Sequence, residues 1–422
     1  MKVTLINISD AGGGAPEACM RLLKALEQRD VNVQMLVNEK RTNNDGVTSI
    51  TNDLAGRLRA KFNLLAERMP FIWFRAKSRA ERFAFSTAST GTDISKHPLV
   101  LNADILHLHW TNFGFLSIDN LKQLLQTQKP VVWTLHDMWT FTGGCHYAGD
   151  CDHFVNECGN CWMLRAPNAD DISHSGWLRK LEMYKAAGNI VFVTCSTWLA
   201  GVAKTTSLLK NFRIEAIPNP IDTAFFSPKD KITYREKWKI DLDQKIILFG
   251  AANILHPRKG IAYLVEALKQ LKTNYPGLND VEIVVFGKNK SFDVSALPYK
   301  VHETNMIDSQ QEMAELYNLA DVYVTPAIED NLPNTVMEAL ACGTPVVAFN
   351  TGGLPDMVDH LKNGYLAEFK SAADFAAGIN YILTSGQKNE LSANARKKVL
   401  DNFTNEIVAE KYLSVYKSIL KK

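Results

Sequence analysis

The chain has 422 residues, which is more than one hydrophobic core usually serves, so we expect two domains. Hydrophobic residues make up 46% and charged residues 22% of it, a balance that excludes extensive disorder. The net charge of +2 provides no overall positive field for gripping nucleic acid, so we expect no nucleic-acid partner.

The start of the chain and its apolar stretches indicate a cytoplasmic protein. The opening MKVTLINISD lacks the charged start and long apolar run of a secretory signal. The apolar stretches at 131–135 and from Lys245 are shorter than the ~20 residues that span a bilayer. Of seven cysteines, four crowd into one segment and the others stand singly, unlike a disulfide framework.

A strand, helix and strand pattern opens the chain. Runs rich in β-formers at 3–8 and 31–37 flank a helical pattern from Pro16 to Gln28. Similar runs follow at 103–110, 130–137 and 189–196. These repeats predict a parallel sheet with helices on both faces.

A glycine-rich turn joins the first strand to the first helix. Gly12, Gly13 and Gly14 let the backbone pass close to a ligand, and the helix N-terminus that follows offers unpaired N–H groups. A phosphate is therefore one candidate occupant. The spacing departs from the usual G-x-G-x-x-G, so a plain turn stays open as the alternative.

A basic and apolar segment runs from Arg57 to Arg82. It holds eight basic and two acidic residues, a local balance of 8 − 2 = +6. The basic residues are Arg57, Arg59, Lys61, Arg68, Arg75, Lys77, Arg79 and Arg82, and the interleaved apolar ones are Phe62, Leu64, Leu65, Phe71, Ile72, Trp73 and Phe74. Two hypotheses remain: peripheral contact with an anionic membrane, or a helical pair whose apolar side packs in the first domain.

Histidines mark the ends of two predicted strands. His136 and Asp137 follow the run at 130–137, where α/β proteins place ligand-binding residues, although a core histidine is the alternative. His107 and His109 share one strand face. Two histidines are too few to bind a metal alone, so we expect those two to pack in the core.

Four cysteines lie close together in the next segment: Cys145, Cys151, Cys158 and Cys161. Four thiolates in a cytoplasmic loop indicate a tetrahedral structural zinc site. The first two are farther apart than the usual spacing of roughly two to four residues, so free or disulfide-bonded cysteines stay open. Four protein ligands leave no open position for catalysis.

A proline-rich connector at 217–228 separates this domain from a second series of elements. We place the boundary between 218 and 219. Beyond it, strand-like runs alternate with helical patterns and predict a second doubly wound domain over 219–404. The strand-like runs are 245–252, 281–287, 321–326 and 344–350, and the helical patterns lie near 260–272, 309–319 and 334–341.

Charged residues mark two loops of the second domain. Arg258 and Lys259 stand just before a helical pattern, where two cations and a helix dipole attract a diphosphate, unless they form only a solvated basic turn. Asp330 and Glu338 lie eight positions apart, one on a loop after a strand and one in the next helix. Carboxylates suit sugar and ribose hydroxyls. The intervening backbone, including Asn331 and Leu332, suits phosphate.

The segment from Asp330 to the strand at 344–350 resembles the retaining family 4 glycosyltransferases. Their motif is a Glu, seven residues, a second Glu, a small-residue helix, Gly and a Pro-Val-Val strand, and this chain has Asp330 in place of the first Glu. The resemblance extends over the glycine turn, the Arg258-Lys259 loop, the connector and the C-terminal helix. It implies a GT-B fold, in which two Rossmann-like domains face a cleft and the helix at 405–422 packs back on the first domain.

The resemblance also implies roles for individual residues. The first acidic residue, Asp330 with Glu329 beside it, contacts the transferred sugar, and Glu338 contacts the nucleotide ribose. Lys259, Arg258 and the glycine loop stabilise the departing diphosphate, and His136 faces donor sugar and acceptor. The resemblance thus implies that His136, Asp330 and Lys259 are catalytic. It also implies a donor-binding site made of Gly13, Gly14, Arg258, Lys259, Asp330, Asn331, Leu332 and Glu338.

We therefore expect a retaining hexosyltransferase without a catalytic cofactor, with the nucleotide-sugar in the second domain and the acceptor in the first. The cysteine-rich loop resembles that of transferases from surface-polysaccharide pathways, which implies a glycan or lipid-linked glycan acceptor at the inner membrane face. Two alternatives remain open. One is a nucleotide-sugar epimerase of the same fold, and the other is an inactive sugar-binding subunit, because Asp330 replaces the family's Glu.

Overall fold

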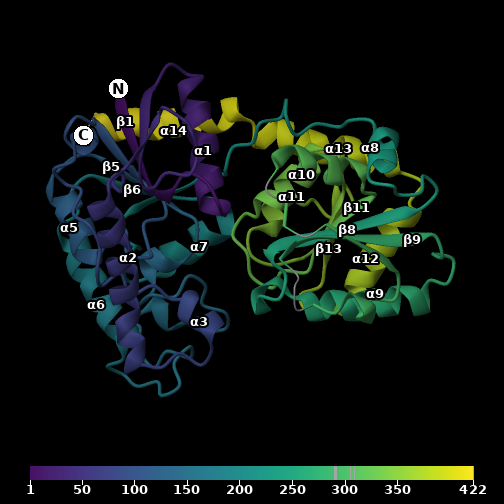
Figure 1. The fold of residues 1–422 in the computed structure, drawn as a ribbon, viewed down its shortest axis with the longest axis horizontal. Helices are drawn as coiled ribbons and strands as arrows, with labels where there is room; N and C mark the ends of the chain where they lie inside the picture. Colours follow the sequence, from purple (N-terminus) through teal and green to yellow (C-terminus); the bar gives the residue numbers. More distant parts are fainter. Residues whose placement is uncertain (289–291, 305, 308, 422) are drawn as a thin grey trace. The chain divides into compact units, whose positions relative to one another are not determined.

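The computed structural model describes residues 1–288, 292–304, 306–307 and 309–421. The chain divides into two compact units (Figure 1). One consists of Met1–Pro220 with Val408–Lys422, and the other of Ile221–Ile407. The division falls within the proline-rich connector, where prolines cannot continue a helix or a central strand.

The first unit is built on a parallel sheet with the order β3-β2-β1-β4-β5-β6-β7. Its strands are β1 (Lys2–Ser9), β2 (Asn32–Glu39), β3 (Val47–Ser49), β4 (Ile105–Leu108), β5 (Val131–Leu135), β6 (Ile190–Thr194) and β7 (Arg213–Ala216). Its helices are α1 (Gly14–Glu27), α2 (Leu54–Arg68), α3 (Arg79–Phe83), α4 (Pro98–Leu101), α5 (Ile118–Gln126), α6 (Ile172–Lys185), α7 (Thr197–Thr205) and α14 (Asn405–Leu420). Short 3-10 turns add η1 (Met69–Ile72), η2 (Trp139–Phe141) and η3 (His153–Val155).

Helices cover both faces of this sheet because its strands are apolar on both sides. Val3 and Leu5 of β1 point into a core formed with α1 and α14. Ile6, one position farther on, points into the opposite core, which is formed with α5, α6 and α7. This alternation follows from the two-residue period of a strand.

The second unit is built on a parallel sheet with the order β10-β9-β8-β11-β12-β13 in the described residues. Its strands are β8 (Lys245–Asn253), β9 (Val281–Lys288), β10 (Lys300–Glu303), β11 (Val322–Thr325), β12 (Val346–Phe349) and β13 (Gly364–Ala367). Its helices are α8 (Lys231–Lys237), α9 (Ile261–Asn274), α10 (Gln310–Leu319), α11 (Asn334–Ala341), α12 (Ala372–Thr384) and α13 (Lys388–Asn402), with 3-10 turns η4 (Pro257–Lys259), η5 (Val294–Ala296) and η6 (Leu354–Asp356).

One face of the second sheet packs on α9 and α12 (Figure 1). On the other face, Tyr317 of α10 packs edge-on against Tyr323 of β11, with ring centroids 5.8 Å apart. Two doubly wound α/β units are therefore present, as the sequence predicts. Within the part of the chain that the structure describes, no helix is long and apolar enough to cross a membrane.

Candidate active site

The order of the second sheet points to the carboxyl ends of the neighbouring strands β8 and β11. These two strands pair in parallel, and the chain continues from β8 toward one edge of the sheet and from β11 toward the other, so the loops that follow them leave in opposite directions at a switch point. Ligands bind in such crevices in open α/β sheets. The η4 turn with Arg258 and Lys259 follows β8, and Asp330 follows β11. The topology thus brings these predicted residues to one place.

Two cations meet one carboxylate at this switch point. The Nζ atom of Lys259 lies 2.6 Å from Oδ2 of Asp330, and a guanidinium nitrogen of Arg258 lies 3.1 Å from the same oxygen. Arg258 also donates to the backbone carbonyl of Glu329. The Glu329 backbone thus helps to hold Arg258, while the Asp330 side chain pairs with both cations.

The three charged groups and their burial shift the pKa values of Asp330 and Lys259. Burial disfavours the charged form of Asp330, but Lys259 and Arg258 outweigh it and lower the pKa of Asp330 to about 2. Burial also lowers the pKa of Lys259, and the Asp330 carboxylate only partly opposes this. The arrangement is an ion cluster with a buried carboxylate and two partly buried cations, which hold an oxyanion at neutral pH.

Backbone geometry fixes the two loops. Gly260 has a left-handed φ of 67°, and a Cβ there would lie 1.9 Å from the carbonyl oxygen of Pro326, so another residue would force the loops apart. The N–H of Ile328 donates to the Arg258 carbonyl at 2.9 Å. Asn331 and Leu332 follow Asp330 as buried residues, and the Asn331 N–H donates to the Asp330 carboxylate at 3.0 Å.

Glu338 occupies the second turn of α11. Its carboxylate is buried and accepts a 2.8 Å hydrogen bond from the hydroxyl of Tyr317. Burial raises the pKa of Tyr317, and the nearby Glu338 charge raises it further, so the phenol stays protonated as the donor. Glu338 is therefore held in one orientation by a residue that the sequence pattern does not reveal.

The first sheet has its switch point between β1 and β4. The glycine turn after β1 has positive φ at Gly12 and Gly13, and Gly14 begins α1. A Cβ on Gly12 would lie 2.3 Å from a guanidinium nitrogen of Arg41. The turn therefore needs glycine and carries a cation beside it. Sequence reasoning did not select Arg41, because it stands in a separate loop after β2.

His136 follows β5 and meets a histidine that follows β4. Its Nε2 lies 3.0 Å from Nδ1 of His109, and the two rings stack with centroids 5.3 Å apart. Burial lowers the pKa of His136 to about 4, which the charge of Asp137 only partly opposes, so the ring is neutral at pH 7. Burial also lowers the pKa of His109. His109 thus belongs to the candidate site, which sequence reasoning missed, whereas His107 lies in the core as expected.

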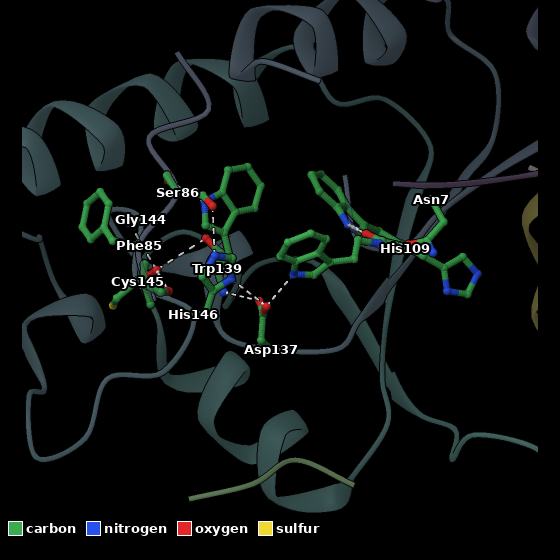
Figure 2. Close-up of polar contacts among 12 residues, drawn as sticks. Asn7, Phe85, Ser86, His109, Asp137, Trp139, Gly144, Cys145 and His146 are labelled. Atoms are coloured by element: carbon green, nitrogen blue, oxygen red, sulfur yellow. Dashed lines mark hydrogen bonds and ion pairs between the residues drawn. The ribbon is translucent and has the colours of Figure 1, made fainter. Parts of the chain in front are cut away.

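Asp137 organises the loop on the other side of His136, and Figure 2 shows its carboxylate directed toward His146. One carboxylate oxygen accepts from the Trp110 indole N–H at 2.7 Å and contacts Nδ1 of His146 at 2.7 Å. The other accepts from the Trp139 backbone N–H at 2.9 Å. The far nitrogen of His146 lies 2.9 Å from the Ser86 hydroxyl (Figure 2).

A small cavity of about 10 Å³ lies at the carboxyl ends of β4 and β5, and its lining includes His109, Thr111, Asn112 and His136. Within the described residues, Nε2 of His109, the Thr111 hydroxyl and the Asn112 side-chain oxygen are buried without a hydrogen-bond partner. Buried polar atoms are nearly always paired in proteins. This end of the sheet therefore has capacity to bind polar groups of a ligand.

A much larger hollow of about 530 Å³ lies beside α13, lined among others by Pro228, Ser392 and Arg396. The Arg396 guanidinium donates to the carbonyl oxygens of Thr223, Phe226 and Ala341 and so serves the fold. None of the predicted site residues lines this hollow. We therefore place the candidate active site at the carboxyl ends of the two sheets. The ion cluster of Arg258, Lys259 and Asp330 lies at one of them, and the buried polar atoms without a partner lie at the other.

The fold brings the four clustered cysteines near one another. The Cys145 thiol is close enough to interact electrostatically with Cys151, Cys158 and Cys161. Burial raises the pKa of Cys158 to about 11 and that of Cys161 to about 12. All four are free thiols. Among the described residues, no group of three or more His, Cys, Asp or Glu side chains is arranged to hold a metal ion. A preformed zinc site is therefore not seen, and the zinc hypothesis stays a prediction.

Two families match the chain. The family described as Glycosyltransferase Family 4 matches residues 12–225, and that described as Glycosyl transferases group 1 matches residues 230–398. An uncharacterized glycosyltransferase of Methanocaldococcus jannaschii is 28% identical over 333 residues, covering 74% of this chain and 82% of that protein. A D-inositol 3-phosphate glycosyltransferase of Acidothermus cellulolyticus is 27% identical over 220 residues, 49% of this chain but only 48% of that protein.

Solved structures share the fold over nearly the whole chain. A sucrose-phosphate synthase of Thermosynechococcus elongatus has a TM-score of 0.68 and 17% identity and covers 100% of this chain and 99% of its own. Anabaena HepE in complex with UDP and glucose has a TM-score of 0.65 and 16% identity, and the match covers 99% of this chain and 100% of HepE. WaaG, a glycosyltransferase involved in lipopolysaccharide biosynthesis, has a TM-score of 0.61 and 14% identity, and the match covers 98% of this chain and 99% of WaaG. Together with the two parallel sheets, these likenesses confirm the GT-B fold.

Proposed function

Since this chain belongs to Glycosyltransferase Family 4, we propose that it transfers a sugar from a nucleotide-sugar to a glycan or lipid-linked glycan acceptor with retention of anomeric configuration. The donor occupies the second unit and the acceptor the first. The reaction takes place in the cytoplasm, at the inner membrane face when the acceptor is lipid-linked. The complexes of Anabaena HepE with UDP and with UDP-glucose make uridine diphosphate sugars the first donors to test.

The observation that carries this proposal is the pair of cations at the β8/β11 switch point. Lys259 and Arg258 together hold one carboxylate oxygen of Asp330. A diphosphate oxygen offers the same charge, and two cations on it stabilise the charge that grows as the sugar departs. A carboxylate oxygen can accept more than one hydrogen bond, so Glu338, held by Tyr317, can also accept from ribose hydroxyls when a donor binds.

Asp330 supports this arrangement in two ways. Its carboxylate stays ionised, because its pKa is about 2, and one of its oxygens contacts both cations. The resemblance assigns the sugar contact to this position or to Glu329. With Asp330 engaged by Lys259 and Arg258, we favour Asp330 as the group that orients the cations when no donor is bound.

The transfer step balances without a further reactant. The bond between the sugar's anomeric carbon and the phosphate oxygen breaks, and a bond from that carbon to the acceptor oxygen forms on the same face. The acceptor's proton passes to the leaving phosphate oxygen. His136, neutral at pH 7 with a pKa near 4, orients sugar or acceptor hydroxyls and carries no net charge into the reaction.

A donor screen followed by a turnover assay tests the proposal. Purified protein is mixed with a panel of nucleotide-sugars, and melting temperature identifies the donors that stabilise it. Release of nucleoside diphosphate from the stabilising donor is then measured with and without glycan acceptors. The anomeric configuration of the product is read by NMR.

Release that depends on the acceptor, with a retained anomer, supports the proposed transfer. An isomerised donor without acceptor would instead identify an epimerase. Stabilisation by a donor without any turnover would identify the sugar-binding subunit. An inverted product would contradict retention but leave the transfer intact.

A further inference from the structure

Helix α2 turns its large apolar side chains to solvent. Leu54 is 73% exposed, Leu58 58%, Phe62 67%, Leu65 70% and Met69, which follows the helix, 50%. At 100° per residue these positions fall within an arc of about 80° around the helix axis. They form one continuous apolar stripe along the helix.

The opposite side of α2 faces the rest of the first unit with small and polar residues. A Cβ on Gly56 would lie 2.9 Å from the Ile50 carbonyl oxygen, so the helix backbone lies close to that residue. The Asn63 amide donates to the Thr92 hydroxyl at 3.2 Å, and Glu67 is fully buried. A helix that packs in a soluble domain by its apolar side shows the reverse pattern. The apolar side of α2 therefore does not pack in the first domain, whereas Phe71 and Phe74 farther along the segment do.

The stripe continues beyond α2. Ile72, in η1, is 62% exposed, and Trp73 is 73% exposed. We define the apolar stripe as Leu54, Leu58, Phe62, Leu65, Met69, Ile72 and Trp73. A group of large exposed apolar side chains of this kind marks a surface that meets another apolar phase or molecule, whereas single exposed residues need no explanation.

Cations surround the stripe. Seven of the eight basic residues between 57 and 82 are exposed, whereas Glu67 is buried. The eighth, Arg68, donates to the backbone carbonyls of Arg82 and Phe85 and lies 3.7 Å from the Glu67 carboxylate. The segment carries +6 in a chain of +2, so the rest of the chain carries 2 − 6 = −4. The positive charge is therefore local to this face.

We propose that α2, η1 and the segment through Arg82 form a docking face for an anionic lipid membrane. The apolar stripe enters the boundary between headgroups and acyl chains, and the exposed cations contact lipid phosphates. Trp73 has the amphipathic ring that favours this interface. The inference goes beyond the proposed function, because it uses none of the residues assigned to donor or acceptor.

Charge complementarity selects a membrane over a second copy of the chain. In a dimer formed through the stripe, Arg57 and Lys61 of one copy would approach the like charges of the other, which destabilises the contact. An anionic bilayer neutralises these same charges. The apolar stripe thus provides the area that is buried on binding, and the cations favour an anionic membrane as the surface that it binds.

Vesicle flotation of the full chain tests the docking face. We expect at least about tenfold tighter binding to vesicles of phosphatidylcholine with phosphatidylglycerol than to phosphatidylcholine alone, with release at high salt. The combined change Leu58→Ser, Phe62→Ser and Leu65→Ser should abolish binding, because it removes the centre of the stripe. The combined change Arg75→Glu, Lys77→Glu and Arg79→Glu should abolish the preference for anionic lipid.

Matched controls lie on other surfaces of the chain. Ile232→Ser, Leu242→Ser and Leu400→Ser together remove as many exposed apolar side chains from the second unit and should leave binding unchanged. Lys204→Glu, Lys210→Glu and Lys269→Glu together make the same change of charge elsewhere. Melting curves verify that every variant is folded.

Three results would overturn the proposal. The first is equal binding to neutral and anionic vesicles, and the second is no binding to either. The third is a dimer, detected by light scattering, that the stripe variant dissociates while vesicle binding is absent. Transfer to a soluble acceptor is a separate readout, so failure of membrane binding and failure of the proposed function are distinguishable.

Discussion

At the scale of single residues, the ion cluster of Arg258, Lys259 and Asp330 gives the sharpest expectations. Lys259 lies 2.6 Å from an anionic oxygen that is already in place, so the cation is oriented before any donor arrives. Preorganised charge of this kind acts mainly on the transition state, in which the diphosphate becomes more negative.

Lys259→Ala should therefore reduce turnover by about 10² to 10³ while weakening donor binding much less. Steady-state kinetics with the identified donor give kcat and KM separately, and a melting curve verifies folding. Lys269→Ala, an exposed lysine on α9, serves as the control and should leave both constants unchanged. Transfer at the wild-type rate by folded Lys259→Ala would disprove the assigned donor site.

Substitution of Glu338 should change the kinetic constants in a different way from substitution of Lys259. Ribose changes little during the reaction, so Glu338→Gln should chiefly raise the KM for the donor and leave kcat within a few-fold. Tyr317→Phe removes the hydroxyl that holds Glu338 and should shift KM in the same direction by a smaller amount. A large fall in kcat at saturating donor in Glu338→Gln would instead assign this carboxylate to the chemical step.

At the scale of elements, strand β4 ties the C-terminal helix to the first sheet. His107 of β4 lies 2.6 Å from the hydroxyl of Tyr416 in α14 and 2.8 Å from the hydroxyl of Thr134 in β5. Burial lowers the pKa of His107 to about 3, and that of His136 to about 4. Both rings are therefore neutral in the folded chain at pH 7.

The sign of the pH dependence follows from these shifts. Below about pH 6.5 the unfolded histidines take up protons that the folded ones do not, so the free energy of unfolding falls as pH is lowered toward 4. His107→Gln keeps a donor and an acceptor but removes one titrating group. The slope should decrease by up to about 1.4 kcal/mol per pH unit.

Denaturant unfolding between pH 7 and pH 4 measures this slope. Thr134→Ser keeps the hydroxyl that bonds His107 and alters only packing, so the slope of that variant should match the wild type. If His107→Gln and wild type lose stability in parallel on acidification, His107 does not stay neutral in the folded protein.

The cysteine loop makes the other prediction at this scale. If Cys145, Cys151, Cys158 and Cys161 close around zinc, purified protein will hold about one zinc per chain, and chelation will lower its melting temperature. Cys158→Ser should lose the metal, whereas Cys342→Ser, which changes a buried cysteine of the second unit, should keep it. Four free thiols in stable, metal-free native protein would show that the loop needs no metal.

At the scale of the whole molecule, the two units should respond differently to a nucleotide. A nucleoside diphosphate of the accepted base should slow backbone hydrogen exchange at 258–262 and 331–338, the loops around the ion cluster. It should leave α2 unchanged, because the docking face takes no part in donor binding. Protection centred on α2 would contradict both assignments, and mass spectrometry of peptides distinguishes these outcomes.

The sequence by itself determined the alternation of strands and helices, the two-unit fold, the loops that carry Lys259 and Asp330, and the helix that carries Glu338. These features are local, because strand and helix periods and loop position after a strand can be read along the chain. The prediction that Asp330 meets the sugar, like the other site assignments, remains to be tested.

Only the tertiary structure decided which side chains meet. His109 stacks on His136 because parallel β4 and β5 align their carboxyl ends, and Arg41 reaches the glycine turn from another loop. Sequence composition left the orientation of α2 open, since an apolar stripe fits a core or a membrane equally well. The structure places that stripe in solvent, because Gly56 and Asn63 form the close contacts with the first unit.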